Sequence, residues 1–117
     1  MNILKKFKDS LNTAVFTTTF VIKDKKDITY VTHDIEDGAW QFFSSDVFDN
    51  YEDVAMIVGL GEIIKIDKTI LDIADLLLGH AAIRQSAGDK WTIKRLPTNS
   101  FHRLVKFNRT FPEKNKK

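Results

Sequence analysis

The histidine and aspartate side chains of this sequence are the groups whose chemistry could support acid–base catalysis or metal binding. The three histidines are dispersed along the chain, and no two of them have the spacing that places a pair of metal ligands on one helix face. Two aspartates follow the first histidine closely, which makes one candidate polar site: His33, Asp34, Asp37 and His80. A hydrolase-like enzyme using this site is the third of three hypotheses, because nothing in the sequence brings the histidines together. The sequence leaves enzymatic activity undecided and favours a protein that is not an enzyme.

Two motifs match cofactor or metal sites only in part. Residues 58–61 read Val-Gly-Leu-Gly after an apolar run, but Ile64 stands where a dinucleotide fingerprint has its third glycine. We therefore interpret these glycines as a turn between elements. Residues 34–38 alternate carboxylates before a glycine, as a calcium loop does, yet the next four residues are Ala, Trp, Gln and Phe rather than ligands. The sequence predicts no cofactor and no metal.

A cluster of acidic residues lies in the loop that spans residues 44–53. Four carboxylates and two aromatic residues, which we expect to be exposed, fall within eight positions: Asp46, Phe48, Asp49, Tyr51, Glu52 and Asp53. Charged loops with aromatic anchors suit a partner protein of opposite charge, because complementary charge speeds association and selects the partner. The favoured hypothesis is a small protein-binding domain that recognises a basic partner through this loop. The alternative is a plain connecting loop.

The charges of the chain are segregated, although the total of 18 basic and 16 acidic side chains gives a net charge of only +2. Residues 1–26 carry a net charge of +4, residues 27–89 of −10, and residues 90–117 of +8. Either the basic ends lie over the acidic middle, or the protein has two faces of opposite sign that attract different partners.

The basic end supports the second hypothesis, a nucleic-acid-binding module. After Lys94 and Arg95, further basic residues interleave with Phe101, Phe107 and Phe111. Lysine and arginine could hold phosphates while the phenylalanines stack on bases. The alternative is that the phenylalanines belong to the core.

Periodicity predicts the elements that must position these residues. Residues 2–11 form one apolar stripe that is typical of a short helix, and residues 14–22 alternate as a strand does. Two further strands, 28–33 and 39–43, are separated by a turn at 34–38, so the three strands predict an antiparallel meander. Residues 54–58 fit either a strand or the start of a helix.

The second half of the chain predicts one main helix and a hairpin. Asp67 is a candidate N-cap and Gly79 a candidate stop, which together predict a helix over residues 67–78. Residues 81–85 and 91–94 are joined by a turn and predict a hairpin. Residues 101–111 fit both a strand and a helix.

The fold class predicted for these 117 residues is α+β, a single domain with an antiparallel sheet of about five strands and the 67–78 helix packed on one face. Within it we expect an N-terminal helix at 1–11, a core at 12–96 and a basic segment at 97–117 with a frayed end. The absence of cysteine excludes disulfides and thiolate chemistry. The longest apolar stretch is far shorter than the roughly 20 residues of a membrane span, so we expect a cytoplasmic protein. The sequence does not indicate the oligomeric state.

The run Ile-Thr-Tyr-Val-Thr-His-Asp at residues 28–34, followed by Asp-Gly-Ala-Trp-Gln-Phe at 37–42, resembles the signature of a group of small bacterial proteins of unknown function. That group is similar to the immunity-protein-like domains found beside polymorphic toxins. The resemblance covers roughly residues 14–93 and includes Trp91, but Leu78 stands where a proline often precedes the glycine. It implies a domain that neutralises a partner protein, and it supplies no catalytic residues.

Overall fold

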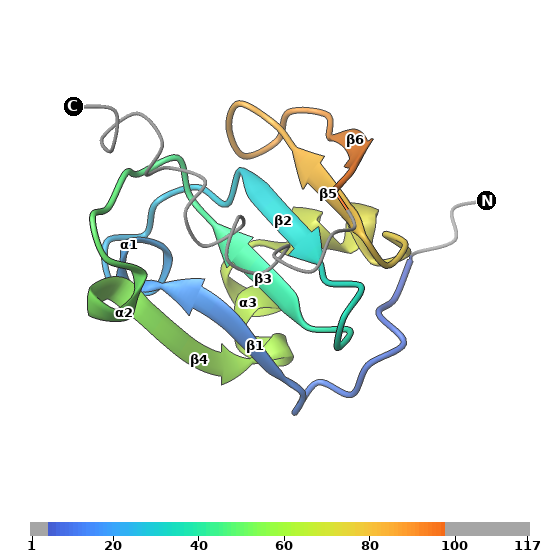
Figure 1. The fold of residues 1–117 in the computed structure, drawn as a ribbon, viewed down its shortest axis with the longest axis horizontal. Coiled ribbons are helices and arrows are strands. Elements are labelled where there is room, and N and C mark those ends of the chain that lie inside the picture. Colours follow the sequence, from blue (N-terminus) through green and yellow to red (C-terminus); the bar gives the residue numbers. More distant parts are fainter. Residues whose placement is uncertain (1–4, 98–117) are drawn as a thin grey trace.

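A single mixed sheet organises the chain in the computed structural model, which describes residues 5–97 (Figure 1). Within these residues its six strands lie in the order β4-β1-β3-β2-β5-β6. Their bounds are β1 Ala14–Thr18, β2 Tyr30–His33, β3 Trp40–Phe43, β4 Ala55–Gly59, β5 His80–Ile83 and β6 Thr92–Arg95. The pair β1–β3 is parallel and the other neighbours are antiparallel. The predicted α+β class and single compact domain are confirmed, whereas the predicted antiparallel sheet of about five strands matches only in part, because the sheet has six strands and one parallel pair.

The predicted meander is correct for its second hairpin only. β2 and β3 pair antiparallel around the turn at residues 34–38, where the N–H of Gly38 donates to the Asp34 carbonyl at 2.8 Å. β1, however, lies beside β3 and not beside β2. The chain leaves β1 through the short helix α1 (Thr19–Ile22) and seven further residues. That connection is long enough to place β2 one strand away, which leaves the position next to β1 open for β3.

The strand predicted over residues 14–22 ends at Thr18. Beyond this residue neither neighbouring strand offers a partner, because β4 begins at Ala55, opposite Thr18. Residues 19–22 instead form one helical turn, in which the Thr19 carbonyl accepts the Lys23 N–H at 2.8 Å, and Val21 is fully buried.

A shorter 3-10 helix replaces the helix predicted over residues 67–78, and a separate α-helix precedes it. α3 (Leu60–Ile66) ends at Asp67, which then caps the 3-10 helix η1 (Lys68–Ile73) by accepting the Thr69 N–H at 2.9 Å. The N-cap prediction for Asp67 is thus confirmed, but the extent and type of helix are wrong. Ile70 and Ile73 are buried at a spacing of three residues, which matches the three residues per turn of a 3-10 helix.

Gly59 and Gly61 lie where β4 passes into α3, and the N-terminal segment packs closely against them. Gly59 ends β4 and Gly61 lies in the first turn of α3, where its N–H donates to the carbonyl of Leu11 at 3.0 Å. A Cβ on Gly59 would lie 3.3 Å from that same carbonyl oxygen. The glycines therefore permit a close approach of the N-terminal segment, in addition to the turn that the sequence suggested.

The N-terminal helix predicted over residues 1–11 is wrong for its described part, because residues 5–11 form bends and turns. Phe7 nevertheless packs on the core, with its ring edge against Trp40 at a centroid distance of 4.8 Å. This ring contact and the hydrogen bond from the Gly61 N–H to the Leu11 carbonyl hold the segment against the domain without a helix.

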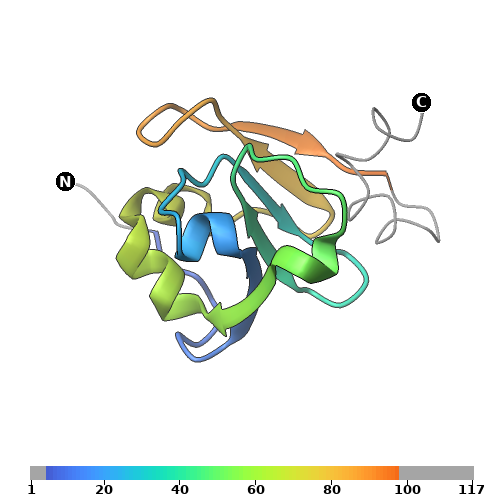
Figure 2. The same ribbon diagram turned by 90° about the vertical axis from the view of Figure 1, so that its left-hand side faces the viewer.

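The core lies between the sheet and the layer of α3 and η1. Figure 2 shows α3 and η1 on one side of the sheet and α2 (Tyr51–Val54) toward the other. Buried apolar side chains from β1, β2 and β3 meet those of the helical layer, and the cluster includes Val15, Val31, Phe42, Leu60, Ile63 and Ile70. No helix in the described part of the chain is long and apolar enough to cross a membrane.

Candidate functional site

The acidic segment, which we define as residues 44–54, runs from the end of β3 through α2 to the start of β4. Asn50 begins α2 by accepting the N–H of Glu52 on its side-chain oxygen at 3.1 Å. This short helix holds Glu52 and Asp53 in its first turn, where carboxylates are favoured by the helix dipole. Asp49, Glu52 and Asp53 are all exposed.

The aromatic residues of the acidic segment pack against each other and against the sheet. Phe48, expected to be exposed, is only 6% exposed, and its ring lies 5.8 Å from the ring of Tyr51. Tyr51 in turn meets Phe43 of β3 edge to face at 5.8 Å. Burial raises the pKa of the Tyr51 hydroxyl from 10.0 to about 12 because it disfavours the phenolate. The prediction of an exposed aromatic is wrong for Phe48, since alternation along the loop turns this ring toward the sheet.

The exposed carboxylates of α2 have no ion-pair partner among residues 5–97. The ion pairs in this range join Lys5 to Asp75, Lys65 to Glu62, and Arg84 to Asp67. Neither Glu52 nor Asp53 takes part in one. Their charge is therefore available to a partner, subject to screening by salt.

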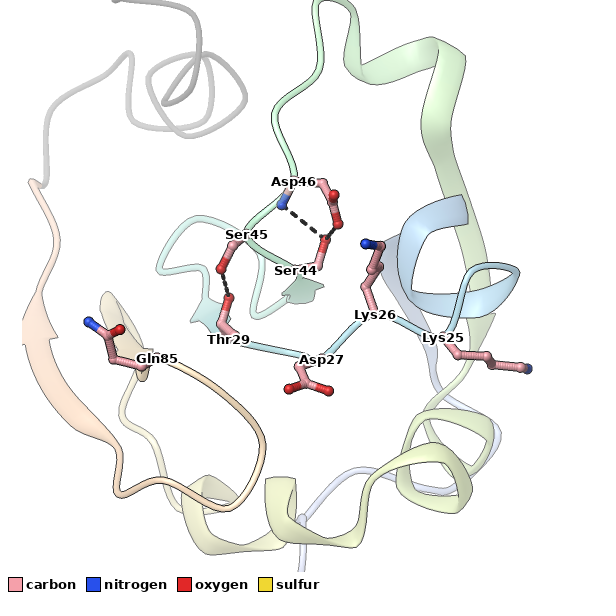
Figure 3. A pocket seen from close by; sticks show the side chains of 8 residues that line it. All are labelled: Lys25, Lys26, Asp27, Thr29, Ser44, Ser45, Asp46 and Gln85. Carbon is pink, nitrogen blue, oxygen red and sulfur yellow. Dashed lines mark hydrogen bonds between the residues drawn. The ribbon is translucent and has the colours of Figure 1, made fainter.

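Asp46 lies apart from the other acids, at a polar pocket of about 400 Å³. Its carboxylate accepts the Ser44 hydroxyl at 2.7 Å, and the hydroxyls of Thr29 and Ser45 lie 2.9 Å apart beside it (Figure 3). The pocket is lined by Lys25, Lys26, Asp27, Thr29, Ser44, Ser45, Asp46 and Gln85. In Figure 3 Lys26 extends on the side of Asp46 and Lys25 extends away from it. Asp46 therefore faces this pocket, and the exposed carboxylates of the acidic segment are those of Asp49, Glu52 and Asp53.

The structure brings together two of the four residues proposed as a polar site. His33 and His80 lie opposite each other on β2 and β5, and both line a cavity of about 900 Å³. Asp34 is instead fully buried, where it accepts the Gln41 amide at 3.0 Å. Asp37 accepts the N–H of Ala39 at 3.0 Å and so holds the turn of the hairpin. Neither aspartate lines the cavity.

Each of the two imidazole rings forms a hydrogen bond with one backbone carbonyl group. His33 Nδ1 lies 2.7 Å from the Leu76 carbonyl oxygen, and His80 Nδ1 lies 3.0 Å from that of Leu78. The His33 ring also stacks on Trp40 at a centroid distance of 3.9 Å. No hydrogen bond within residues 5–97 joins either ring to a carboxylate, so the histidine–carboxylate pair of a general base is missing from this range. Nor do any three histidine, aspartate or glutamate side chains there gather closely enough to hold a metal ion.

Sequence reasoning missed the exposed apolar residues at two places. Leu77 and Leu78, expected in the core stripe of a helix, are 68% and 48% exposed beside the histidine cavity, because η1 ends before them. Ile57 of β4 is 64% exposed on the outermost strand. The run of uncharged residues in 55–59 is the signal that could have found this second place.

The residues proposed for nucleic-acid binding fall largely outside the described range, as does His102. Of that group, Lys94 and Arg95 are described and are exposed on β6. Comparison of the chain with protein-family models, with curated proteins and with solved structures finds no match.

Proposed function

We propose that this chain is a non-enzymatic cytoplasmic protein-binding domain whose acidic segment holds a basic partner protein. The observation that carries the proposal is the exposure of Glu52 and Asp53 in a short capped helix, with no cation paired to them among residues 5–97. The proposal agrees with the resemblance to immunity-protein-like domains, which implies a domain that neutralises a partner protein.

The aromatic contacts beneath the acidic segment support the proposal because they fix its position before binding. Phe48 and Tyr51 pack on each other, and Tyr51 packs on Phe43 of the sheet. A loop that is already ordered loses little conformational entropy when a partner docks. Charges held in fixed positions also discriminate between partners better than charges on a loose loop.

The test is a comparison of partner capture by charge variants. In the first variant Asp49, Glu52 and Asp53 are all replaced by lysine. The control variant carries lysine at Asp24, Glu36 and Asp72, which are exposed acids elsewhere on the surface, so the net charge changes equally. The tagged proteins are used for affinity purification from native cells, and the proteins retained are identified and quantified.

The acidic-segment variant should retain at least about tenfold less of the basic partner than the control variant, because it repels the partner at the contact itself. Capture by the wild-type protein should also weaken as salt is raised. Equal retention by the two variants would contradict the proposal. Retention of nucleic acid in place of a protein would favour the alternative, a nucleic-acid-binding module that uses the basic C-terminal segment.

A further inference from the structure

The two edge strands of the sheet differ in how they are protected against pairing with another strand. β6 reads Thr-Ile-Lys-Arg, and its lysine and arginine are the charged residues that commonly block edge-to-edge association. β4 reads Ala-Met-Ile-Val-Gly and has no charge, no proline and an unbroken register of five pairs with β1. We propose that a basic partner protein adds an extended segment to the open edge of β4, an inference that rests on the proposed function of the adjoining acidic segment.

The backbone of β4 offers hydrogen-bonding groups on its outer side. Just beyond the strand, the Leu60 N–H donates to the Thr13 carbonyl at 2.8 Å. Because ladder groups alternate in direction along an antiparallel strand, Met56 and Val58 also face β1, and the groups of Ile57 and Gly59 point away from it. Among residues 5–97, no backbone hydrogen bond outside the regular elements involves Ile57 or the Gly59 N–H, whereas the Gly59 carbonyl, at the N-cap of α3, accepts the first bond of that helix.

The charges at the two ends of β4 determine the chemistry of the added segment. Glu52 and Asp53 precede the strand, and Glu62 follows it in the first turn of α3. Between them Ile57 lies opposite Phe16 on the same face of the sheet. The complementary segment is extended, with apolar residues at its centre and lysine or arginine at both ends.

A second copy of this chain fits the edge poorly. In a symmetric antiparallel pair of β4 strands centred on Ile57, α2 of each copy would face the start of α3 of the other. This arrangement opposes Glu52 and Asp53 to Glu62, and like charges placed opposite one another are destabilising. Glu62 is also only loosely neutralised, since its carboxylate lies 3.8 Å from the Lys65 ammonium on the exposed surface.

The first experiment locates the added strand on the full-length protein. The probe is a synthetic peptide in which valine and threonine alternate between paired lysines at both ends. Its control keeps the lysines but has proline at the central positions, which prevents it from pairing as a strand. Amide hydrogen exchange is measured residue by residue with each peptide at low salt.

The alternating peptide should slow exchange at the outward amides of Ile57 and Gly59. The amides of Met56 and Val58, which already face β1, should change little, and the proline peptide should protect none of the four. Failure of the alternating peptide to protect Ile57 and Gly59 would overturn the inference.

The second experiment removes one outward donor. Gly59 has φ −74°, which proline adopts readily, so Gly59→Pro deletes the outward N–H while keeping the backbone conformation. Gly59→Ala is the matched control, because it introduces the same Cβ near Leu11 and retains the N–H. Thermal unfolding establishes that both variants are folded.

Gly59→Pro should bind the alternating peptide at least about tenfold more weakly than Gly59→Ala, since one backbone hydrogen bond is lost and the ring obstructs its neighbour. Equal binding by the two variants would overturn strand addition. If partner capture still depended on Asp49, Glu52 and Asp53 in that case, the proposed function would stand and only the mode of binding would fall. If partner capture depended neither on the three acidic residues nor on Gly59→Pro, the proposed function itself would be contradicted.

Discussion

Tyr51 shows how a single side chain ties the acidic segment to the sheet. Its ring contacts Phe43 on one side and Phe48 on the other, and burial raises the pKa of its hydroxyl to about 12. In the unfolded chain this hydroxyl ionises near its ordinary pKa of 10.0. Folding therefore favours the neutral form of the hydroxyl.

The raised pKa predicts a loss of stability in alkaline solution. Below pH 10 the hydroxyl is neutral in both states, whereas between pH 10 and about pH 12 it ionises in the unfolded state first, which favours unfolding. Denaturant unfolding measured across this range should show a steeper fall in stability for the wild-type protein than for Tyr51→Phe. Parallel pH profiles for the two proteins would show that the Tyr51 hydroxyl is not linked to folding.

At the same scale, the sequence predicts the solvent exposure of charged residues better than that of aromatic residues. The exposure of Glu52 and Asp53 follows from their charge, because unpaired carboxylates are rarely buried. The burial of Phe48 depends on which way the loop turns, and the pairing of His33 with His80 depends on β5 lying beside β2. Neither fact is contained in local spacing, so the sequence alone does not show that the two histidines are neighbours or that Asp34 and Asp37 lie elsewhere.

At the scale of elements, the β2–β3 hairpin depends on the conformation of one turn residue. Gly38 has φ +73°, a left-handed conformation that is unfavourable for residues with a Cβ. No atom lies within 4 Å of the position that a Cβ would occupy there, so a substitution meets no steric obstacle. The effect of a substitution should therefore come from the backbone alone.

Gly38→Ala should lower the free energy of unfolding by about 1 kcal/mol, because alanine resists positive φ. Gly38→Asn is the control and should cost less, since asparagine tolerates this conformation. Chemical denaturation of the three proteins measures the difference. A loss as large for asparagine as for alanine would mean that φ is not the cause.

Elements defined by local chemistry were predicted, and elements defined by distant contacts were not. Both hairpins follow from turn residues that lie between alternating strands, and the cap at Asp67 follows from one side chain. The choice of a 3-10 helix at 68–73 and the parallel contact of β1 with β3 arise from packing between segments far apart in the sequence. A periodicity analysis does not include that information.

At the scale of the whole molecule, Arg84 joins the sheet to the helical layer. Its fully buried guanidinium contacts the Asp67 carboxylate at 2.6 Å and the Thr69 hydroxyl at 2.8 Å, and its Nε donates to the Ile28 carbonyl at 3.0 Å. The same group lies 3.9 Å above the ring of Trp91. One side chain thus links four segments of the chain.

Arg84→Met should destabilise the fold by about 3 to 5 kcal/mol, because it leaves the Asp67 carboxylate without its buried partner. The double variant Arg84→Met with Asp67→Asn should recover part of that loss, since asparagine carries no charge and still caps η1. Thermal and denaturant unfolding of both variants measures this. A double variant no more stable than the single one would assign the loss to packing and not to charge.

The structure answers in part whether the basic ends of the chain lie over its acidic middle. At the N-terminal end, Lys5 pairs with Asp75 of the acidic middle at 3.3 Å, although both side chains are largely exposed and such a pair contributes little. The acids of α2 form no ion pair with the described basic residues. The basic C-terminal segment lies outside the residues described here.

The position of β1 also constrains how the chain can fold while it is being synthesised. Both neighbours of β1 come later in the sequence, since β3 begins at Trp40 and β4 ends at Gly59. On a ribosome, β1 therefore emerges with neither neighbour available, and its backbone groups that face β4 stay bonded to water until Gly59 has left the exit tunnel. The β2–β3 hairpin can close earlier because its two strands are joined by a short turn. Vectorial synthesis thus favours a hairpin that forms first and a central strand that is enclosed afterwards.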